Sequence, residues 1–392
     1  MLRTIKKIAG KILRISYRLG YRLIPCNKRM ILFISFHGRG YSDNPKAIHE
    51  YITSHPEYKE YQCIWAIKQH RQKKLVIENT KVIEYFSLSY FYFLARSKYW
   101  IVNCKLPNYV LKKENQVYLQ TWHGTPLKKL AHDISVSAPI TFYRSKMTLE
   151  QMQSTYDEDV QKYTYMLSPS AFTTKVFRSA FQIEQNKLLE TGYPRNDILS
   201  TYSTLDIHKI YTAYNLPRDK KIILYAPTWR DNSYTMQGYT FKLEVNFKMW
   251  REILGDEYII LFKPHYLIVN TFIVEDDFVY YIDPEKDIRD LYLISDILIT
   301  DYSSVFFDFA LLRRPIYFYM YDLVEYQTVL RGFYLDINKD LPGPIYTEEK
   351  KMLEQIKQGT FNSEVIDAFN QRFNTHEDGN ASMRVVNAVL GR

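Results

Sequence analysis

The sequence predicts an α/β protein built from two parallel sheets, each covered by helices on both faces. From Pro25 onward, short apolar runs alternate with longer polar segments that suit helices. The alternation restarts after a polar stretch at residues 200–220. The length of 392 residues suffices for about two domains, and 46% hydrophobic with 24% charged residues is the balance of a globular chain. We therefore expect two domains of βα units.

In the first half, each expected strand is a run of four to eight mostly apolar residues. Runs of this length, separated by helix-length segments, are typical of strands buried on both faces of a parallel sheet. The expected strands cover residues 30–36, 62–67, 81–85, 99–104, 116–121, 163–168 and 187–191.

The second half repeats the pattern. Its expected strands cover residues 221–226, 258–263, 278–282, 296–300 and 315–320. The final stretch, residues 363–390, suits a helix, and we expect it to pack back across the two domains. The predicted division is a leader at 1–28, a first domain at 29–205 and a second domain at 206–392.

The leader carries the chain's excess of positive charge. Residues 1–30 contain nine lysines and arginines and no acidic residue, whereas the net charge of the whole chain is +9. The rest of the chain is therefore neutral. The basic pI of about 9.0 does not indicate a nucleic-acid partner, because the body has no net charge with which to hold a phosphate backbone.

Helical spacing divides the leader into two stripes. The basic stripe is Lys7, Lys11, Arg14, Arg18 and Arg22, and the apolar stripe is Ile5, Ile8, Ile12, Ile15, Leu19 and Leu23. Such a helix suits the headgroup plane of an anionic bilayer, so we expect residues 1–24 to bind a membrane surface. The alternative is a helix that docks its apolar stripe on the protein's own body. No apolar stretch is long enough to cross a bilayer, and the bases that interrupt the leader exclude a secretory signal.

Several classes of site are disfavoured by what the sequence lacks. Cys26, Cys63 and Cys104 are widely spaced and odd in number, so we expect neither a disulfide framework nor a cysteine-based zinc site. There is no P-loop and no G-x-G-x-x-G fingerprint, which disfavours an ATPase or a nicotinamide enzyme. Asp197, Asp231 and Asp301 lack the close spacing of metal ligands, and no cofactor or metal site is readable.

Polar loops follow five of the expected strands. In open α/β sheets, ligands bind beyond the carboxyl ends of the strands, so these loops are the candidate functional residues. They mix turn residues with His, Arg, Asp, Ser and Thr, and they cover residues 122–126, 192–197, 227–231, 264–265 and 301–304.

Two histidines stand at strand ends in opposite halves, His123 between Trp122 and Gly124, and His265 after Pro264. One imidazole can remove a proton from a hydroxyl near neutral pH, and a second can donate to a developing phosphate charge. For either histidine alone, a structural role is the alternative.

The loop that begins at Asp301 opens an expected helix at 303–312. Its backbone N–H groups, with the hydroxyls of Ser303 and Ser304, would form an anion site, the alternative being a plain helix N-cap. Arg230, Lys263 and Arg331 are candidate countercharges for a diphosphate, although a single arginine is more often a surface residue.

Taken together, these loops resemble the CDP-glycerol glycerophosphotransferase family of teichoic-acid synthesis. The resemblance runs in order from about residue 115 to 335, and the five motifs together are specific. It rests on residues 120–128, 192–197, 226–231, 263–265 and 300–304, with Arg331-Gly332-Phe333 as a further element.

The resemblance implies a GT-B-type architecture, with two Rossmann-like domains facing a cleft. The N-terminal amphipathic helix expected from the leader fits a lipid-linked acceptor. The first domain would bind the acceptor and the second the CDP-linked donor. His123 and His265 match the family's essential histidines. The donor-binding residues would be Arg230, Lys263, Asp301, Ser303, Ser304 and Arg331. The acceptor-side residues would be Trp122, Gly124, Thr125, Asn196 and Asp197.

The implied reaction transfers glycerol phosphate from CDP-glycerol to a hydroxyl of an undecaprenyl-diphosphate-linked disaccharide, releasing CMP. The enzyme would sit peripherally on the cytoplasmic face of a bacterial membrane. With a leader of about 30 residues and two domains, the chain lacks room for a large membrane-targeting domain, which favours a primase-like enzyme over a polymerase. The alternatives are CDP-ribitol as donor, a capsule polymer as product, a sugar transferase of the same architecture, and a non-catalytic membrane scaffold.

Overall fold

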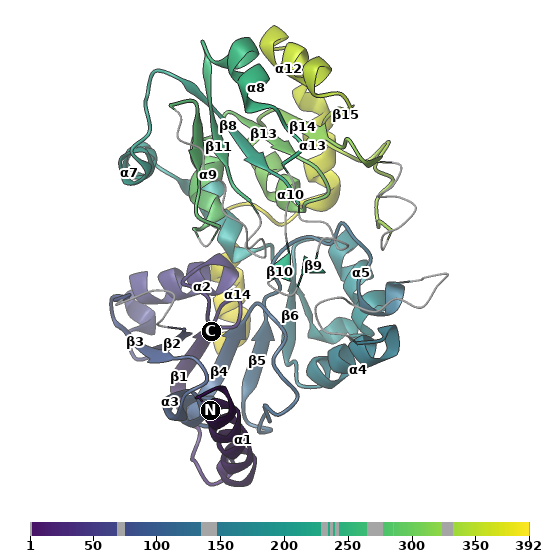
Figure 1. Ribbon diagram of the computed structural model, residues 1–392. Helices are drawn as coiled ribbons and strands as arrows, with labels where there is room; N and C mark the ends of the chain where they lie inside the picture. Colours follow the sequence, from purple (N-terminus) through teal and green to yellow (C-terminus); the bar gives the residue numbers. More distant parts are fainter. Residues whose placement is uncertain are drawn as a thin grey trace. The chain divides into compact units, whose positions relative to one another are not determined.

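The computed structural model describes residues 2–68, 75–134, 147–228, 234–235, 238–239, 243–264, 277–284, 286–323 and 332–391. The protein is an α/β protein with two parallel sheets, as predicted (Figure 1). Its contacts divide the chain into two compact units. The first comprises Met1–His123, Gln153–Asp197 and His376–Arg392, and the second comprises Gly124–Met152 and Ile198–Thr375.

The first unit holds a seven-stranded sheet in the order β3-β2-β1-β4-β5-β6-β7, and every neighbouring pair is parallel. All seven predicted runs are strands, and their ends agree within a few residues. The strands are β1 (Asn27–Ile34), β2 (Gln62–Ile67), β3 (Thr80–Glu84), β4 (Ser97–Val102), β5 (Val117–Gln120), β6 (Tyr165–Ser168) and β7 (Leu188–Glu190).

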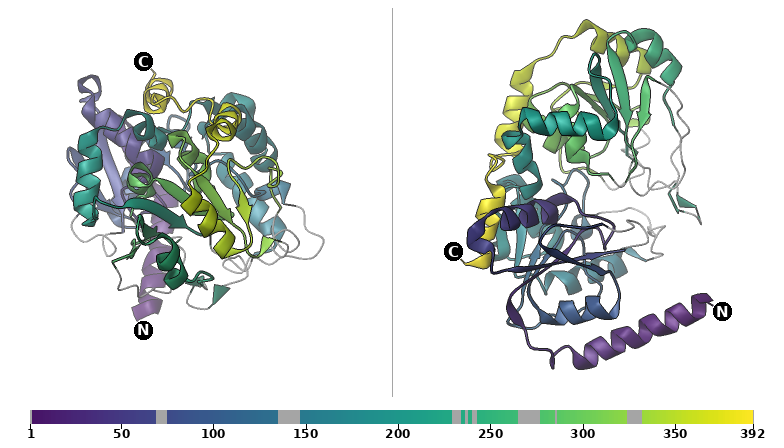
Figure 2. Two further views of the ribbon diagram at one scale, coloured as in Figure 1. Left: turned by 90° about the horizontal axis from the view of Figure 1, so that it is seen from above. Right: turned by 90° about the vertical axis from the view of Figure 1, so that its left-hand side faces the viewer.

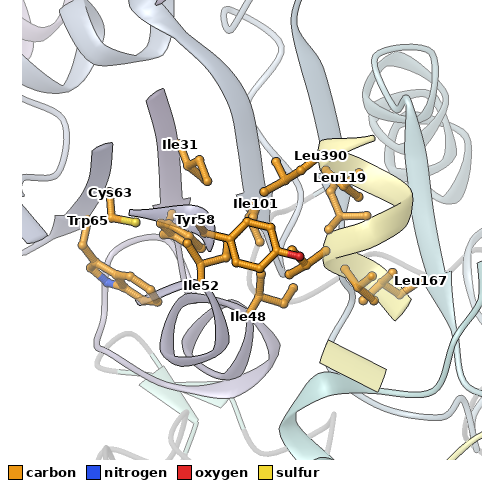
Figure 3. Packing of buried hydrophobic residues seen from close by; sticks show 14 of the residues in the cluster. Ile31, Ile48, Ile52, Tyr58, Cys63, Trp65, Ile101, Leu119, Leu167 and Leu390 are labelled. Atoms are coloured by element: carbon orange, nitrogen blue, oxygen red, sulfur yellow. The ribbon is translucent and has the colours of Figure 1, made fainter. Parts of the chain in front are cut away.

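The core of this unit lies between the sheet and the helices on its faces. Ile31, Ile101 and Leu119 project from β1, β4 and β5. Ile48 of α2 and Leu390 of α14 belong to the same buried cluster (Figure 3). The α-helices that lie wholly in this unit are α1 (Leu2–Gly20), α2 (Asp43–Ser54), α3 (Leu88–Arg96), α5 (Ala171–Phe181) and α14 (Ala381–Leu390).

The second unit holds a six-stranded sheet in the order β12-β11-β8-β13-β14-β15, again parallel throughout. The five predicted strands are confirmed. They are β8 (Lys221–Ala226), β11 (Tyr258–Phe262), β12 (Val279–Tyr281), β13 (Ile297–Thr300) and β14 (Ile316–Tyr319). The edge strand β15 (Ile345–Tyr346) and the hairpin β9 (Tyr234–Thr235) and β10 (Gly238–Tyr239) were not predicted, because two residues make no readable apolar run.

The remaining helices connect or cover these strands. The predicted helix at 303–312 is a short α-helix, α10 (Val305–Phe309), followed by a 3₁₀ turn. The other α-helices of the described residues are α4 (Leu149–Val160), α6 (Asp197–Thr201), α7 (Thr204–Tyr214), α8 (Phe247–Leu254), α9 (Ile288–Ile294), α12 (Glu349–Gln358) and α13 (Ser363–Phe373). The 3₁₀ turns are Pro56–Tyr58, Ala131–Asp133, Gln185–Lys187, Pro194–Asn196 and Ala310–Leu312.

The units are not the two contiguous segments, 29–205 and 206–392, that the sequence pattern indicates. Gly124–Met152 packs with the second unit, where Lys128 forms an antiparallel bridge with Phe333. The segment from His376 onward packs with the first unit, because Val385 and Val386 of α14 are buried in its core. Helices were expected over 363–390, and α13 and α14 form there, one in each unit.

The leader forms the helix α1 within the first unit, where it lies beside α3 (Figure 2). It docks through Tyr17, whose ring contacts Phe91 at 5.3 Å and whose hydroxyl donates to the Leu111 carbonyl at 2.7 Å. The guanidinium of Arg14 lies over the rings of Phe86 and Tyr109.

The apolar side chains that the sequence placed on one stripe of the leader remain exposed to solvent. Ile12, Ile15, Leu19 and Leu23 are 57%, 49%, 78% and 84% exposed. The alternative that this stripe docks on the protein's own body is therefore wrong for these four residues. Among the residues that the structure describes, no helix has the length and hydropathy to span a bilayer.

Candidate active site

Both sheets share one topological feature that locates a candidate site. In each sheet the strand order reverses beside the first strand of the unit, between β1 and β4 in the first and between β8 and β13 in the second. Ligands of open α/β sheets bind beyond the carboxyl ends of the strands at such a switch point. Two sets of side chains lie there, one in each unit: the His123 group (Asp43, Asn44, Asn103, His123 and Arg195) and the Asp301 group (Thr228, Asp301 and Tyr302).

The orientation of His123 is set by the end of the neighbouring strand. Its Nδ1 lies 2.9 Å from the backbone carbonyl oxygen of Asn103, which directly follows β4. A carbonyl can only accept, so Nδ1 carries the hydrogen and Nε2 keeps a free lone pair. The ring also stacks on Trp122, with 4.6 Å between centroids and 26° between planes. The geometry therefore presents Nε2 as the basic nitrogen.

The surroundings of His123 keep it neutral. The ring is accessible at the surface, yet the protein atoms around it desolvate the charged form, and this desolvation lowers its pKa. The Asn103 carbonyl and the Asp43 carboxylate oppose the shift, whereas Arg195 adds to it. A neutral imidazole with a free Nε2 can accept a proton from a hydroxyl near neutral pH.

The turn that carries His123 is held by a buried polar network. The Gln120 Oε1 accepts a hydrogen bond from the Trp122 N–H at 3.0 Å, and Trp122 itself adopts a left-handed φ of 52°. The Gln120 amide donates in turn to the carbonyl oxygen of Cys104 and to the hydroxyl of Tyr163, which donates to the buried Asp159 carboxylate at 2.8 Å. This network fixes the backbone just before the candidate base.

The sequence did not single out Asp43, Asn44, Asn103 or Arg195. Asn103 lay inside an expected strand, and Arg195 was visible only as part of the loop at 192–197. Asp43 and Asn44 precede Pro45 at the start of α2, which is a helix-start pattern with no indication of chemistry. The signal for this group is three-dimensional, because the residues come from four separate segments.

The predicted acceptor-side residues divide between the two units. Trp122, Asn196 and Asp197 belong to the first unit, and Gly124 and Thr125 to the second. Trp122 is buried against Phe177 and Phe181, and Thr125 and Asn196 are also buried.

Asp197 has a clear structural role. Its carboxylate accepts hydrogen bonds from the backbone N–H groups of Ala381 and Ser382 at 2.9 and 2.8 Å, in the first turn of α14. It therefore caps this helix. An acceptor role for Asp197 stays a prediction.

In the second unit, Asp301 joins the ends of the two central strands. Its Oδ1 accepts from the backbone N–H of Thr228, after β8, at 2.8 Å and from the N–H of Tyr302 at 2.7 Å. The Tyr302 hydroxyl donates to Asp322 at 3.1 Å, and its ring stacks on Phe333. Asp301 thus shapes the loop rather than simply projecting from it, and its predicted contact with a donor molecule stays a prediction.

Ser303 and Ser304 lie at the start of α10, both partly exposed. The Ser304 side chain makes no capping bond to the helix, and the Val305 N–H lies 3.5 Å from the Ser303 hydroxyl. Because α10 has only five residues, its dipole adds little to an anion site. Any anion bound here would depend on the hydroxyls and nearby backbone N–H groups.

Lys263 is buried at the end of β11. Its ammonium donates to the backbone carbonyls of Asp283 at 3.0 Å and Pro284 at 2.8 Å. These bonds fix the loop that follows β12 and bring a positive charge close to the end of β11. The predicted residues His265, Arg230 and Arg331 lie outside the described residues.

The segment after His123 is fastened to the second unit. The Lys129 N–H donates to the Gly332 carbonyl at 3.0 Å, and the Tyr334 N–H donates to the Leu127 carbonyl at 2.9 Å. The Tyr334 hydroxyl donates to Asp133 at 2.6 Å. Backbone hydrogen bonds therefore pair the end of the motif at residues 120–128 with the element at residues 331–333.

Within the described residues, no three or more His, Cys, Asp or Glu side chains form a group able to hold a metal ion. The three cysteines are free thiols. Burial raises the pKa of the Cys63 and Cys104 thiols to about 12, so neither forms a thiolate near neutral pH.

Comparison with known proteins identifies the family. Residues 15–391 match the family described as CDP-glycerol:poly(glycerophosphate) glycerophosphotransferase. The chain belongs to this family. It is 42% identical, over 99% of both chains, to the teichoic acid glycerol-phosphate transferase of Staphylococcus aureus (strain NCTC 8325 / PS 47). It is also 40% identical to the teichoic acid poly(glycerol phosphate) polymerase of Bacillus spizizenii (strain ATCC 23059 / NRRL B-14472 / W23), over 100% of this chain and 99% of that one.

A solved structure of a family member is closely similar. A variant of the wall teichoic acid polymerase TagF, soaked with CDPG, superposes with a TM-score of 0.88 at 37% identity, covering 99% of this chain and 95% of that chain. The family resemblance of the motifs is thus confirmed over the full chain, well beyond residues 115–335. The glycerophosphotransferase has the α/β fold with parallel sheets that the sequence predicted.

Proposed function

We propose that this glycerophosphotransferase transfers glycerol phosphate from CDP-glycerol to a hydroxyl of an undecaprenyl-diphosphate-linked saccharide in wall teichoic acid synthesis, releasing CMP. The observation that carries the proposal is His123, held as a neutral imidazole with Nε2 free at the switch point of the first sheet. Family membership supplies the donor class, and the more similar relatives carry glycerol rather than ribitol in their names.

In the proposed mechanism, Nε2 of His123 takes the proton of the acceptor hydroxyl, whose oxygen attacks the phosphorus that bears glycerol. The bond to the bridging oxygen of the diphosphate breaks, and CMP leaves with its electron pair. His265, Arg331 and the hydroxyls of Ser303 and Ser304 neutralise the growing charge, with Arg230 and Lys263 as further countercharges. Catalysis of this kind depends mainly on positioning and electrostatic stabilisation.

The proposed architecture is of the GT-B type, with two Rossmann-like domains facing a cleft. The strand orders support it, because both sheets reverse beside their first strand and present polar loops there. His123 and His265 would converge on the donor from opposite domains, with Trp122, Gly124, Thr125, Asn196 and Asp197 on the acceptor side.

We also propose that α1 binds the cytoplasmic face of the membrane peripherally, beside the lipid-linked acceptor. Ile12, Ile15 and Leu19 of α1 are exposed, and so is Leu23 in the turn that follows the helix. The bases Lys11 and Arg18 of α1 and Arg22 of the same turn are exposed as well. Apolar side chains flanked by bases suit an anionic bilayer surface. Vesicles containing anionic phospholipid should bind the protein, whereas Leu19→Glu together with Leu23→Glu should abolish most of this binding. Binding that is unaffected would exclude α1 as the contact.

The decisive experiment incubates the protein with CDP-glycerol and a lipid-linked disaccharide analogue and measures CMP release and product mass. The expected product carries added glycerol phosphate, whereas CDP-ribitol in a parallel reaction should yield far less product. The proposal would be overturned if CMP were released only from CDP-ribitol, or if only a UDP- or GDP-sugar were turned over. It would also be overturned if no donor were turned over.

The same product spectrum counts the units that are added. Chain length does not favour a primase over a polymerase, because a polymerase of almost the same length matches the whole chain. A single added mass of glycerol phosphate identifies a primase-like enzyme, and a ladder identifies a polymerase.

A further inference from the structure

We propose that Asp43 and Asn44, the first two residues of α2, are positioning residues that hold His123 ready to accept a proton. The inference rests on the proposed function for the identity of the base, but it names residues outside every motif of the sequence. It is carried by the contacts of these two side chains with the ends of three other segments.

Asp43 acts on His123 through Asn103. One carboxylate oxygen of Asp43 accepts from the side-chain amide of Asn103 at 2.5 Å, and the backbone carbonyl of Asn103 is the partner of His123 Nδ1. The Asn103 amide is held on its other side as well, because its Oδ1 accepts from the Phe36 N–H at 2.8 Å. Because both ends of its side chain are bound, Asn103 is held in place with its backbone carbonyl beside the imidazole.

The second carboxylate oxygen of Asp43 pairs with Arg195. The Arg195 Nη1 lies 2.8 Å from Asp43 Oδ1, and both side chains are almost completely buried. This pair ties the start of α2 to the turn at Pro194–Asn196. It also places one negative and one positive charge near the imidazole, and their effects on its protonation oppose each other.

Asn44 holds the turn that carries His123. Its side-chain amide donates to the backbone carbonyls of Thr121 and Trp122, at 3.2 and 3.3 Å, which are the two residues before His123. Its Oδ1 accepts from the Arg195 N–H at 3.1 Å. The adjacent side chains of Asp43 and Asn44 therefore fix the hydrogen-bond partner of the base and the backbone from which it projects.

The conformation and burial of Asp43 are energetically unfavourable in themselves. Asp43 has a φ of 64°, in the left-handed region that favours glycine, and it carries a buried charge. Both features are unfavourable unless the surrounding structure compensates for them, and they concentrate at functional sites. A helix start needs neither, because an ordinary cap satisfies it at lower cost.

Asp43→Asn keeps the size and the tolerance of a left-handed φ but removes the charge. We expect kcat to fall at least tenfold while the KM for CDP-glycerol changes less than twofold. The acid limb of kcat/KM plotted against pH, where activity falls as His123 becomes protonated, should move to lower pH. The negative charge that favours protonated His123 is lost in this variant, whereas the positive charge of Arg195 remains. Asn44→Ala should lower kcat in the same way with little movement of the acid limb.

Asp287→Asn is the matched control, because Asp287 also pairs with a nearby arginine in a partly buried site at the start of a helix, α9 in the second unit. It should lower thermal stability and leave the acid limb in place. Wild-type kcat and an unmoved acid limb in folded Asp43→Asn would overturn the proposal. So would a loss of activity in Asp43→Asn that follows only its thermal stability, with the acid limb unmoved.

A second measurement uses the wild-type protein, so that it depends neither on the folding of the Asp43 and Asn44 variants nor on turnover. ¹⁵N-labelled histidine spectra, with the His123 signal assigned by its loss in His123→Gln, report which ring nitrogen carries the proton. We expect the Nδ1–H form at neutral pH, and the Nε2–H form would overturn the proposal. Absence of CMP release from CDP-glycerol, by contrast, would overturn the proposed function without changing this result.

Discussion

At the scale of single residues, the state of His123 follows from one backbone carbonyl. The Asn103 oxygen selects the Nδ1–H form, and desolvation disfavours the charged ring. A general base needs both properties, since it must present a lone pair and must be neutral at the working pH. No sequence motif encodes this contact, because the partner of Nδ1 is a backbone carbonyl, and the side-chain contacts that hold Asn103 join residues far apart in the sequence.

His123→Ala should lose at least about 100-fold in turnover while the protein stays folded, as is typical for removal of a general acid or base. The same loss is expected for His265→Ala, and His208→Ala, at an exposed position on α7, serves as the control. CMP release under saturating CDP-glycerol measures the effect, and near-normal turnover would remove the altered residue from the mechanism.

The pH dependence of the unmodified enzyme tests the same residue. Because the pKa of His123 is lowered, its neutral form persists below the ordinary range of imidazole. The acid limb of kcat/KM should therefore have its midpoint below the ordinary imidazole value of about 6.5. A decrease that begins above pH 7 would contradict this assignment.

His49 shows the opposite use of an imidazole, as a neutral core residue. It is buried, its ring nitrogens bond to the hydroxyls of Tyr41 and Thr80, and burial lowers its pKa to about 4. The unfolded chain binds a proton below pH 6.5 that the folded chain does not, so stability falls as pH drops from 6.5 towards 4. At pH 5 the expected loss is about 2 kcal/mol relative to pH 7.

Urea unfolding at pH 7 and pH 5, followed by tryptophan fluorescence, measures this loss. His49→Gln should lack the pH-dependent part, although it will be less stable at both values, and the exposed His208→Gln should behave as the wild type does. Equal pH dependence in wild type and His49→Gln would show that another group is responsible.

At the scale of elements, strands were predictable where burial gives them a run of apolar residues. All twelve predicted strands form, and the run 296–300, for example, becomes β13 with every residue buried. Helix α1 was predictable from its spacing, but its docking face was not. Tyr17 and Arg14 make that contact with aromatic rings from distant segments, and amphipathic spacing cannot reveal a partner.

The loop after β7 depends on a glycine for two separate reasons. Gly192 has a φ of 81°, and a Cβ there would lie 2.4 Å from the His376 carbonyl oxygen. Gly359 ends α12 with a φ of 69° and nothing within 4 Å. Gly359→Ala should cost about 1 kcal/mol from backbone strain alone, whereas Gly192→Ala should cost about 3 kcal/mol or more because backbone must also move. Urea unfolding compares the two, and equal losses would mean that the close contact relaxes freely.

At the scale of the whole molecule, the two predicted sheets form, and each compact unit is assembled from segments that are separate in the chain, whereas the sequence predicted contiguous domains. Local hydrophobicity shows where strands are, but not which sheet a loop or a terminal helix joins. Lys128 pairs with Phe333 across more than 200 positions of the chain, and Asp197 caps a helix that begins at Ala381. Such contacts depend on complementarity between distant segments, which a single sequence does not display.

Helix α14 should be needed for the first unit and not for the second. Val386 is 1% exposed in the core of the first unit, whereas Met383 on the same helix is 39% exposed. Val386→Asp should remove hydrogen-exchange protection from β1, β4 and β5 while β8 and β13 stay protected, because an unpaired charge would enter the first core only. Met383→Asp should change neither set. Equal loss of protection in both sheets after Val386→Asp would contradict the assignment of α14 to the first unit.

The position of α14 also determines the order of events while the protein is being made. A ribosome that has translated β1 to β7 has released a sheet whose core still lacks Val385, Val386 and Leu390. All residues of the second unit are translated before those residues. The core of the first unit, whose strands are synthesised first, is therefore completed only when the C-terminal helix emerges. Until then, the apolar surface that α14 covers must be shielded in some other way.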